Sequence, residues 1–137
     1  GSVICGSNEF IHSARRIRKA LGGGMRQAGI IAAAGIDAFE TAHDQIIIDH
    51  SHAIQLAQAL YKIEPIKLDL NNVKTNIVYF NLLHKDISDS EFLSKMKENG
   101  ILFFDVSPRR FRLVTHYGIS KEDINFTIEV FNKILSL

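Results

Sequence analysis

The hydrophobic period of this chain changes after Pro65, and that change constrains the fold more than any other feature. Strand-like runs, with apolar residues on alternating positions, follow at residues 66–70, 76–82, 101–106 and 111–116. Helices are predicted to begin after Ser88 and after Ser120, each of which has an acidic residue three positions later, and the first ends at Asn99-Gly100. The resulting order, β-β-α-β-β-α, predicts an α+β layer in which helices cover one face of a sheet.

The segment before Pro65 is mainly helical in pattern. Residues 2–6 are rich in β-formers and predict a strand, for which the chain offers no evident neighbour. An amphipathic helix is then predicted from Ser7 or Asn8 to the glycines at 22–24.

Two further helical stretches follow these glycines. Residues 27–41 are dense in alanine, isoleucine and glycine, which predicts a helix buried on most sides. Residues 43–62 predict a longer amphipathic helix, whose apolar stripe we expect to contain Ile47, Ile54, Ala57 and Tyr61. A boundary near residues 40–44 would divide the chain into a unit of residues 1–42 and a unit of residues 43–137.

The stretch ALGGGMRQAG at residues 20–29 combines backbone freedom with positive charge. Glycines let main-chain N–H groups approach an anion, and Arg26 could bind the same anion as Lys19, which lies just before the glycines. On the residues alone, a helix C-cap followed by a flexible corner is the favoured explanation of the glycines. The pattern of a nucleotide P-loop or of a dinucleotide-binding loop is absent from this stretch.

A second candidate site lies in the strand predicted at residues 111–116. Alternation places Arg112 on one side of this strand, and Phe111, Leu113 and Thr115 on the other. An arginine flanked by apolar residues needs a carboxylate or a phosphate. The partner is either an internal salt bridge or a ligand, and the residues alone leave both alternatives open.

Composition gives little support to other functional classes. The net charge is +1, which favours neither nucleic acid nor an anionic membrane, and no apolar run of 18 residues is present. His50 and His52 are two positions apart on a predicted helix and cannot easily share a metal ion, so we expect no metal site. The single cysteine, Cys5, cannot form an internal disulfide, which fits a cytoplasmic protein.

Several motifs together resemble the C-terminal portion of the low-specificity L-threonine aldolases. They are GSVICGS at residues 1–7, RRIRKALGGGMRQAGIIAAAGI at 15–36, Asp49-His50 with Ala53, VKTNIVYF at 73–80 and RLVTH at 112–116. The resemblance implies an α/β fold with an α+β C-terminal domain, as a fragment of a fold-type I enzyme related to aspartate aminotransferase. It also implies pyridoxal phosphate as cofactor, cleavage of L-threonine or L-allo-threonine to glycine and acetaldehyde, and a homotetramer.

The resemblance also implies roles for individual residues. Arg26 and Lys19 match family residues near the cofactor phosphate, at a site shared between subunits. Arg112 matches the residue that binds the α-carboxylate of the amino-acid substrate. Residues 1–42 correspond to the end of the cofactor-binding large domain, and residues 43–137 to the small domain.

No catalytic residue is expected within this chain. The family's Schiff-base lysine belongs to a segment upstream of Ser2, so we expect the chain to need the N-terminal part of the subunit and to be inactive alone. Two alternatives are a non-catalytic module for association or ligand binding, and a related pyridoxal-phosphate lyase that acts on another β-hydroxy amino acid.

Overall fold

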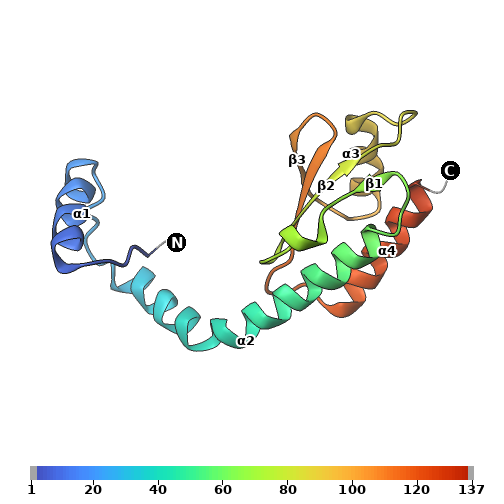
Figure 1. Cartoon of the computed structure of the whole chain (residues 1–137). Coiled ribbons are helices and arrows are strands. Elements are labelled where there is room, and N and C mark those ends of the chain that lie inside the picture. Colours follow the sequence, from blue (N-terminus) through green and yellow to red (C-terminus); the bar gives the residue numbers. More distant parts are fainter. Residues whose placement is uncertain (1–2, 136–137) are drawn as a thin grey trace. The chain divides into compact units, whose positions relative to one another are not determined.

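The computed structural model describes residues 3–135 and contains two compact units, Gly1–Ala42 and His43–Leu137 (Figure 1). Helix α2 (Gly29–Leu60) begins in the first unit and ends in the second.

The first unit contains helix α1 (Asn8–Ala20) and the first part of α2. Ser7 caps α1, because its side-chain oxygen accepts a hydrogen bond from the backbone N–H of Phe10 at 3.2 Å. The strand predicted at residues 2–6 is wrong for the described residues 3–6, which have no regular secondary structure. A strand must pair its backbone groups with a neighbour, and these residues pair with none in the part of the chain that the structure describes.

The second unit is built on a four-stranded antiparallel sheet with the order β1-β2-β4-β3. Its strands are β1 (Ile66–Lys67), β2 (Ile77–Leu82), β3 (Phe104–Ser107) and β4 (Arg110–Val114), and the short 3-10 helix η1 (Leu70–Asn72) connects the first two. With α3 (Asp89–Glu98) and α4 (Lys121–Leu135), the predicted order β-β-α-β-β-α is confirmed.

Helices begin after Ser88 and after Ser120, as the sequence predicts. The Ser88 side chain accepts a hydrogen bond from the backbone N–H of Glu91 at 3.2 Å at the start of α3. Before α4, the Ser120 backbone N–H donates to Asp123 Oδ2 at 2.8 Å, and the Asp123 N–H donates back to Ser120 Oγ at 3.1 Å. Gly100 has a positive φ of 80° just after α3, as a helix C-cap requires.

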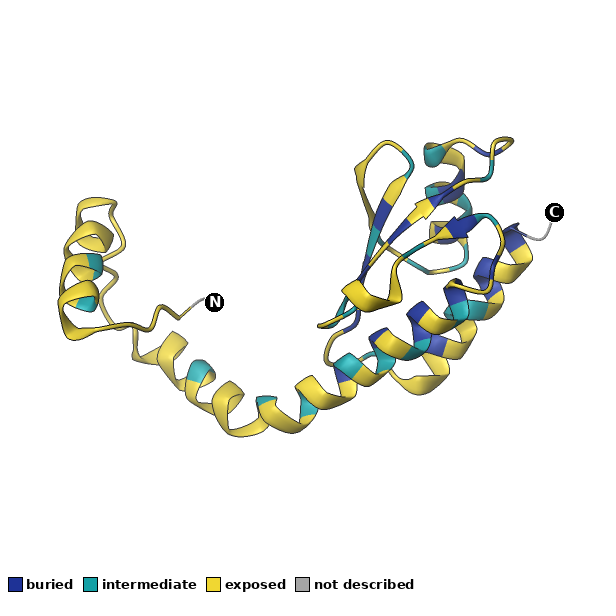
Figure 2. Ribbon diagram, viewed as in Figure 1, coloured by how far each residue is buried: buried dark blue, intermediate teal, exposed yellow. Residues whose placement is uncertain are grey.

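The core lies on one face of the sheet, against α3, α4 and the C-terminal half of α2 (Figure 2). Five phenylalanine rings pack together at its centre: Phe80, Phe92, Phe103, Phe111 and Phe131. The opposite face of the sheet, here called the open face, carries Tyr79, Arg110, Arg112 and Val114, which are exposed or half-buried. The unit is therefore a two-layer α+β structure with one uncovered sheet face.

Two expectations about α2 are wrong. Its buried residues are Asp49, Ala53, Leu56, Ala57 and Leu60, whereas Ile47, Ile54 and Tyr61 of the predicted stripe are exposed. The first part of the helix is not buried either, as its largely exposed colouring in Figure 2 shows. Ile30 is 81% and Phe39 72% exposed. Apolar residues surround this part of the helix, so the sequence does not distinguish one buried face.

Candidate functional site

The first two glycines of the stretch at residues 22–24 cap the end of α1. Gly22 has a φ of +84°, and its N–H donates to the Lys19 carbonyl at 3.2 Å. The Gly23 N–H donates to the Arg18 carbonyl at 2.8 Å. This pair of hydrogen bonds is a Schellman motif, which requires a left-handed residue at the position of Gly22. The helix C-cap that the sequence left open is therefore confirmed.

The third glycine lies against the side chain of Lys19. A Cβ atom added to Gly24 would come within 2.8 Å of Lys19 Nζ and 2.9 Å of Lys19 Cδ. Arg26 follows in an exposed turn, and neither Lys19 nor Arg26 has a carboxylate partner within residues 3–135. Glycine at position 24 thus leaves room for an ammonium group beside the main chain, with a second free cation two residues later.

This arrangement suits a phosphate group. Within the described residues, the N–H groups of Gly24 and Arg26 donate no hydrogen bond, so they are free for an anion. Charge-assisted hydrogen bonds from an ammonium, a guanidinium and the main chain are the contacts that phosphate oxygens accept. The cap and the candidate anion site therefore use different glycines of the same stretch.

Arg112 lies on the open face, in the middle of β4. Its cross-strand partners are Tyr79 of β2 and Phe104 of β3. Its Nε atom is buried and has no hydrogen-bond partner, and Arg112 forms no salt bridge with any residue from 3 to 135. The internal salt bridge that the sequence left open is thus not formed. A buried donor without an acceptor is uncommon in folded proteins, and it makes Arg112 the candidate binding residue of the open face.

Arg109, three residues earlier, is bonded on nearly all sides. Its backbone N–H donates to Asp89 Oδ2 at 2.8 Å, and its guanidinium donates to Asp89 Oδ1 at 2.8 Å. It also donates to three backbone carbonyls, those of Leu82, His84 and Ile87. Sequence reasoning gave Arg109 no role; its position directly after Pro108, between two predicted strands, was the available signal for a turn residue.

Arg110 differs from both neighbours. Its guanidinium carbon lies 5.1 Å from the centre of the Tyr79 ring, in a cation–π contact on the exposed surface. Of the three arginines, only Arg112 combines a buried donor with the lack of a partner.

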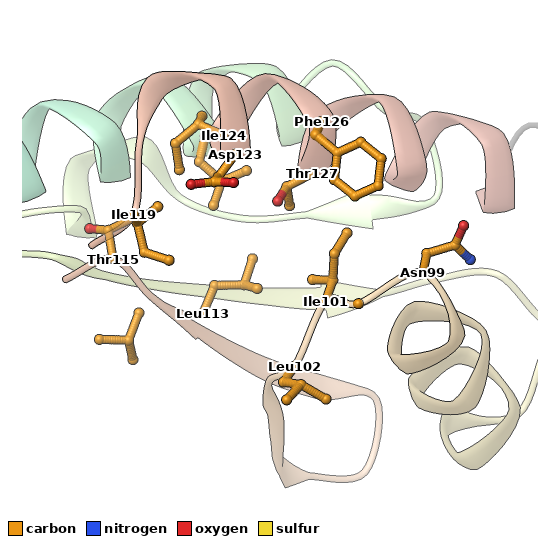
Figure 3. A pocket seen from close by; sticks show the side chains of 13 residues that line it. Asn99, Ile101, Leu102, Leu113, Thr115, Ile119, Asp123, Ile124, Phe126 and Thr127 are labelled. Carbon is orange, nitrogen blue, oxygen red and sulfur yellow. The ribbon is translucent and has the colours of Figure 1, made fainter. Parts of the chain in front are cut away.

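A cavity of about 310 Å³ lies on the helix-covered side of β4 (Figure 3). Leu113 of β4 and Thr115, which follows the strand, line it on one side, and Ile124 and Phe126 line it from α4. Leu113 and Thr115 alternate with Arg112, so the cavity lies on the other side of the sheet from the guanidinium. It therefore does not belong to the same site as Arg112.

The histidines of α2 gather no metal ligands. Among residues 3–135, no group of three His, Cys, Asp or Glu side chains could hold an ion. His52 is half-buried, with Nδ1 lacking a hydrogen-bond partner.

None of the helices in the described part of the chain is long and apolar enough to span a bilayer.

The sequence-predicted site residues fall into two groups. Lys19 and Arg26 belong to the first unit, where the Lys19 side chain lies against Gly24. Arg112 belongs to the second unit, on the open face of its sheet.

Known proteins are similar to this chain in sequence and in fold. The chain is 35% identical over 136 residues to "Low-specificity L-threonine aldolase 1" of Arabidopsis thaliana, and 34% identical over 125 residues to "Low specificity L-threonine aldolase" of Escherichia coli strain K12. These matches cover 98% and 90% of this chain but 38% and 35% of the relatives. The chain thus spans less than two-fifths of the length of these curated relatives.

A solved structure supports the fold. The NifS-like protein of Rickettsia africae superposes with a TM-score of 0.62 at 15% identity, over 72% of this chain and 31% of the other. This likeness confirms the predicted fold, a mixed α/β fragment of fold type I. The relatives and the structural neighbours indicate pyridoxal phosphate as the cofactor. The profile of the family described as "Beta-eliminating lyase" matches residues 1–82, more than half of the sequence, and the chain therefore belongs to the β-eliminating lyase family.

Proposed function

We propose that this chain forms the C-terminal part of a pyridoxal-phosphate-dependent threonine aldolase, in which Arg112 binds the α-carboxylate of the amino acid. The observation that carries the proposal is the buried, unpartnered Nε of Arg112 on the open face of the sheet. The aldolase names of the relatives support the choice of reaction.

Arg112 contributes binding and orientation. Its planar guanidinium accommodates both oxygens of a carboxylate, which fixes the amino acid about its Cα atom. Orientation matters because only one of the bonds at Cα is broken, and that bond must be aligned for the reaction. When bound, pyridoxal phosphate supplies an electron sink for the negative charge that develops at Cα.

Lys19 and Arg26 are the residues that would hold the cofactor phosphate. Their positive charges and the free N–H groups of residues 24 and 26 fit that group, and Gly24 admits the Lys19 side chain. The lysine that binds the cofactor covalently would come from the N-terminal part of the subunit. On this proposal the isolated chain is inactive, and the complete protein is a cytoplasmic homotetramer that cleaves threonine or allo-threonine.

A non-catalytic binding module is the second candidate. The observation that favours it is the separate hydrophobic core of residues 43–137, which needs no residue of the first unit.

Reconstitution distinguishes the two candidates. The chain is mixed with the N-terminal remainder of the Arabidopsis relative and pyridoxal phosphate, and both visible absorbance and threonine cleavage are recorded. The aldolase proposal predicts a new absorbance band and acetaldehyde release, neither of which either part produces alone. If the mixture shows no absorbance change and no cleavage while a covalent fusion of the two parts also fails, the aldolase proposal is wrong.

Two arginine variants then test the site. Arg112→Lys replaces a two-pronged contact with a point charge, so the KM for the amino acid should rise and kcat should fall. Arg110→Lys is the matched control, because it lies on the same strand and face but already contacts Tyr79. Equal effects of the two variants would remove Arg112 from the substrate site.

A further inference from the structure

Strand β4, which carries Arg112, is attached to the rest of the second unit at both ends by side chains. Arg109 precedes the strand and Thr115 follows it. Neither residue lies on the open face beside Arg112, and neither has been given a role in the proposed reaction.

The first attachment fixes the turn before β4. Arg109 has a φ of +61°, and its backbone N–H and its guanidinium both bind the carboxylate of Asp89. The Arg109 carbonyl in turn accepts a hydrogen bond from the Leu82 N–H at 2.9 Å. The start of β4 is therefore tied to the beginning of α3 and to the end of β2.

The second attachment joins the end of β4 to helix α2. Thr115 is 3% exposed, and its hydroxyl donates to the backbone carbonyl of Asp49 at 2.6 Å. Its N–H donates to the Asn76 carbonyl at 2.9 Å, and Asn76 Nδ2 donates to the Thr115 carbonyl at 2.6 Å. The hydroxyl also donates, at the longer distance of 3.4 Å, to the Asn76 carbonyl. Its removal breaks the side-chain link of Thr115 to α2 and this longer contact, and it leaves the bonds of the Thr115 N–H and carbonyl to Asn76 in place.

These attachments matter because, among the described residues, no side-chain hydrogen bond or ion pair orients Arg112. Its Nε has no hydrogen-bond partner, and no carboxylate holds its guanidinium within residues 3–135. The direction of the guanidinium must then come from the backbone of β4 and from the residues packed around it.

We infer that Thr115 is a positioning residue for Arg112: its hydroxyl, bound to the Asp49 carbonyl, holds the end of β4 so that the guanidinium is fixed for a carboxylate. This inference rests on the proposed role of Arg112. Thr115 acts through the strand, because its side chain points to the helix-covered side (Figure 3). A hydrogen bond between buried groups is directional, so this one restricts the position of the strand end relative to the helix, which apolar contact alone does not.

The first experiment measures Arg112 directly by nuclear magnetic resonance in the isolated chain. Its readout is the hydrogen-exchange rate of the Arg112 Nε–H group, assigned by its disappearance in Arg112→Lys. Thr115→Val removes the hydroxyl and keeps the shape, and Thr115→Ser keeps the hydroxyl. We expect the exchange rate to rise roughly fivefold or more in the valine variant and to stay near the original in the serine variant.

A variant elsewhere controls for loss of stability. Ile134→Val removes one buried methylene group from α4 and lowers the stability of the unit, while it leaves the residues of β4 and the hydrogen bonds of Thr115 unchanged. Urea midpoints of the two valine variants are compared with the exchange rates. The inference is overturned if Thr115→Val leaves the exchange rate unchanged, or if Ile134→Val raises it as much at the same midpoint.

The second experiment uses the reconstituted enzyme. Misplacement of the carboxylate contact should raise KM for the amino acid by about threefold to tenfold in Thr115→Val, with rescue in Thr115→Ser. An Arg112→Lys variant without effect on KM would contradict the proposed function, even where the exchange result holds. A normal KM in Thr115→Val beside an impaired Arg112→Lys would contradict the role of Thr115 alone.

Discussion

Three arginines within four residues have three different environments in this protein. Arg109 is bound to a carboxylate and to backbone carbonyls, Arg110 contacts an aromatic ring, and Arg112 has a buried donor without a partner. The three side chains are chemically identical but differ in how many of their donors are hydrogen-bonded. We therefore expect them to respond differently to the same substitution.

Arg109→Lys should destabilise the second unit, whereas Arg112→Lys should not. A lysine at position 109 cannot replace the contacts to Asp89 and to the carbonyls, so we expect the free energy of unfolding to fall by about 2–3 kcal/mol. For Arg112→Lys we expect a change within about 0.5 kcal/mol, since no native hydrogen bond is lost. Urea unfolding of the isolated chain measures both. Similar losses in the two variants would contradict the distinction.

Gly24→Ala should weaken cofactor binding in the reconstituted enzyme. The added Cβ would displace the Lys19 side chain, and a displaced ammonium weakens one charge-assisted hydrogen bond to phosphate, so we expect affinity for pyridoxal phosphate to fall roughly threefold to tenfold. Gly29→Ala is the matched control, because apart from the adjacent backbone nothing lies within 4 Å of its added Cβ. Absorbance titration compares the two, and equal affinities would speak against Lys19 as a phosphate contact.

At the scale of elements, helix α4 depends on a charged cap. The Asp123 carboxylate accepts hydrogen bonds from the backbone N–H and from the hydroxyl of Ser120. These two bonds, the backbone one more strongly, hold the pKa of the Asp123 carboxyl below its ordinary value. A group with a lowered native pKa stabilises the fold above its unfolded pKa, about 3.9 for aspartate, and this contribution is lost as pH falls through the lower native value.

Asp123→Asn should therefore remove part of the acid sensitivity of the second unit. We expect the variant to be less stable than the original at pH 7 and the difference to shrink as pH falls below about 4. Urea midpoints measured across this range give the comparison. A difference that stays constant with pH would show that the carboxylate charge is not what stabilises the cap.

The phenylalanine cluster should account for much of the stability of the sheet and its helices. Phe80 packs against four other rings, and its replacement in Phe80→Ala should cost about 3–5 kcal/mol of unfolding free energy. Phe126→Ala is the control on α4, where the ring is half exposed, and should cost less than about 1 kcal/mol. Equal losses would mean that the rings do not form the core.

The sequence predicted the second unit far better than the first. Ser88 and Ser120 begin their helices because each serine side chain accepts a hydrogen bond from a backbone N–H three residues later. The alternation in β2 and β4 predicts strands correctly because only one face of their sheet is buried. The face of α2 was predicted wrongly because Ile46, Ile47 and Ile48 occupy three sides of the helix, so period alone cannot say which side is covered.

The candidate site was predicted only in part, for a similar reason. Alternation placed Arg112 on the opposite side of the strand from Phe111 and Leu113, and this is confirmed, since those two residues are buried and Arg112 lies on the open face. The contacts of Arg109 and Thr115 could not be predicted, because their acceptors are backbone carbonyls distant in sequence, which carry no residue signature. The roles of Lys19, Arg26 and Arg112 toward a ligand stay predictions.

At the scale of the whole molecule, the two units differ in what they bury. Residues 43–137 contain every buried apolar residue in the described part of the chain, whereas α1 contains none. The first part of α2 leaves Ile31 and Ile36 exposed as well as Ile30 and Phe39. A surface of this kind is typical of a segment that packs against another polypeptide region.

Hydrogen exchange of the isolated and the reconstituted protein tests this difference. Amides in α3, α4 and the central strands should exchange only through global unfolding, because they lie around a closed core. Amides of residues 29–42 should exchange much faster in the isolated chain, since nearly all side chains of this segment are exposed. Addition of the N-terminal remainder of the Arabidopsis relative should slow these amides and leave those of α3 unchanged. If residues 29–42 exchange at the same rate with and without that remainder, their exposed apolar side chains are not its binding surface, and the proposal that the two parts form one subunit loses its structural basis.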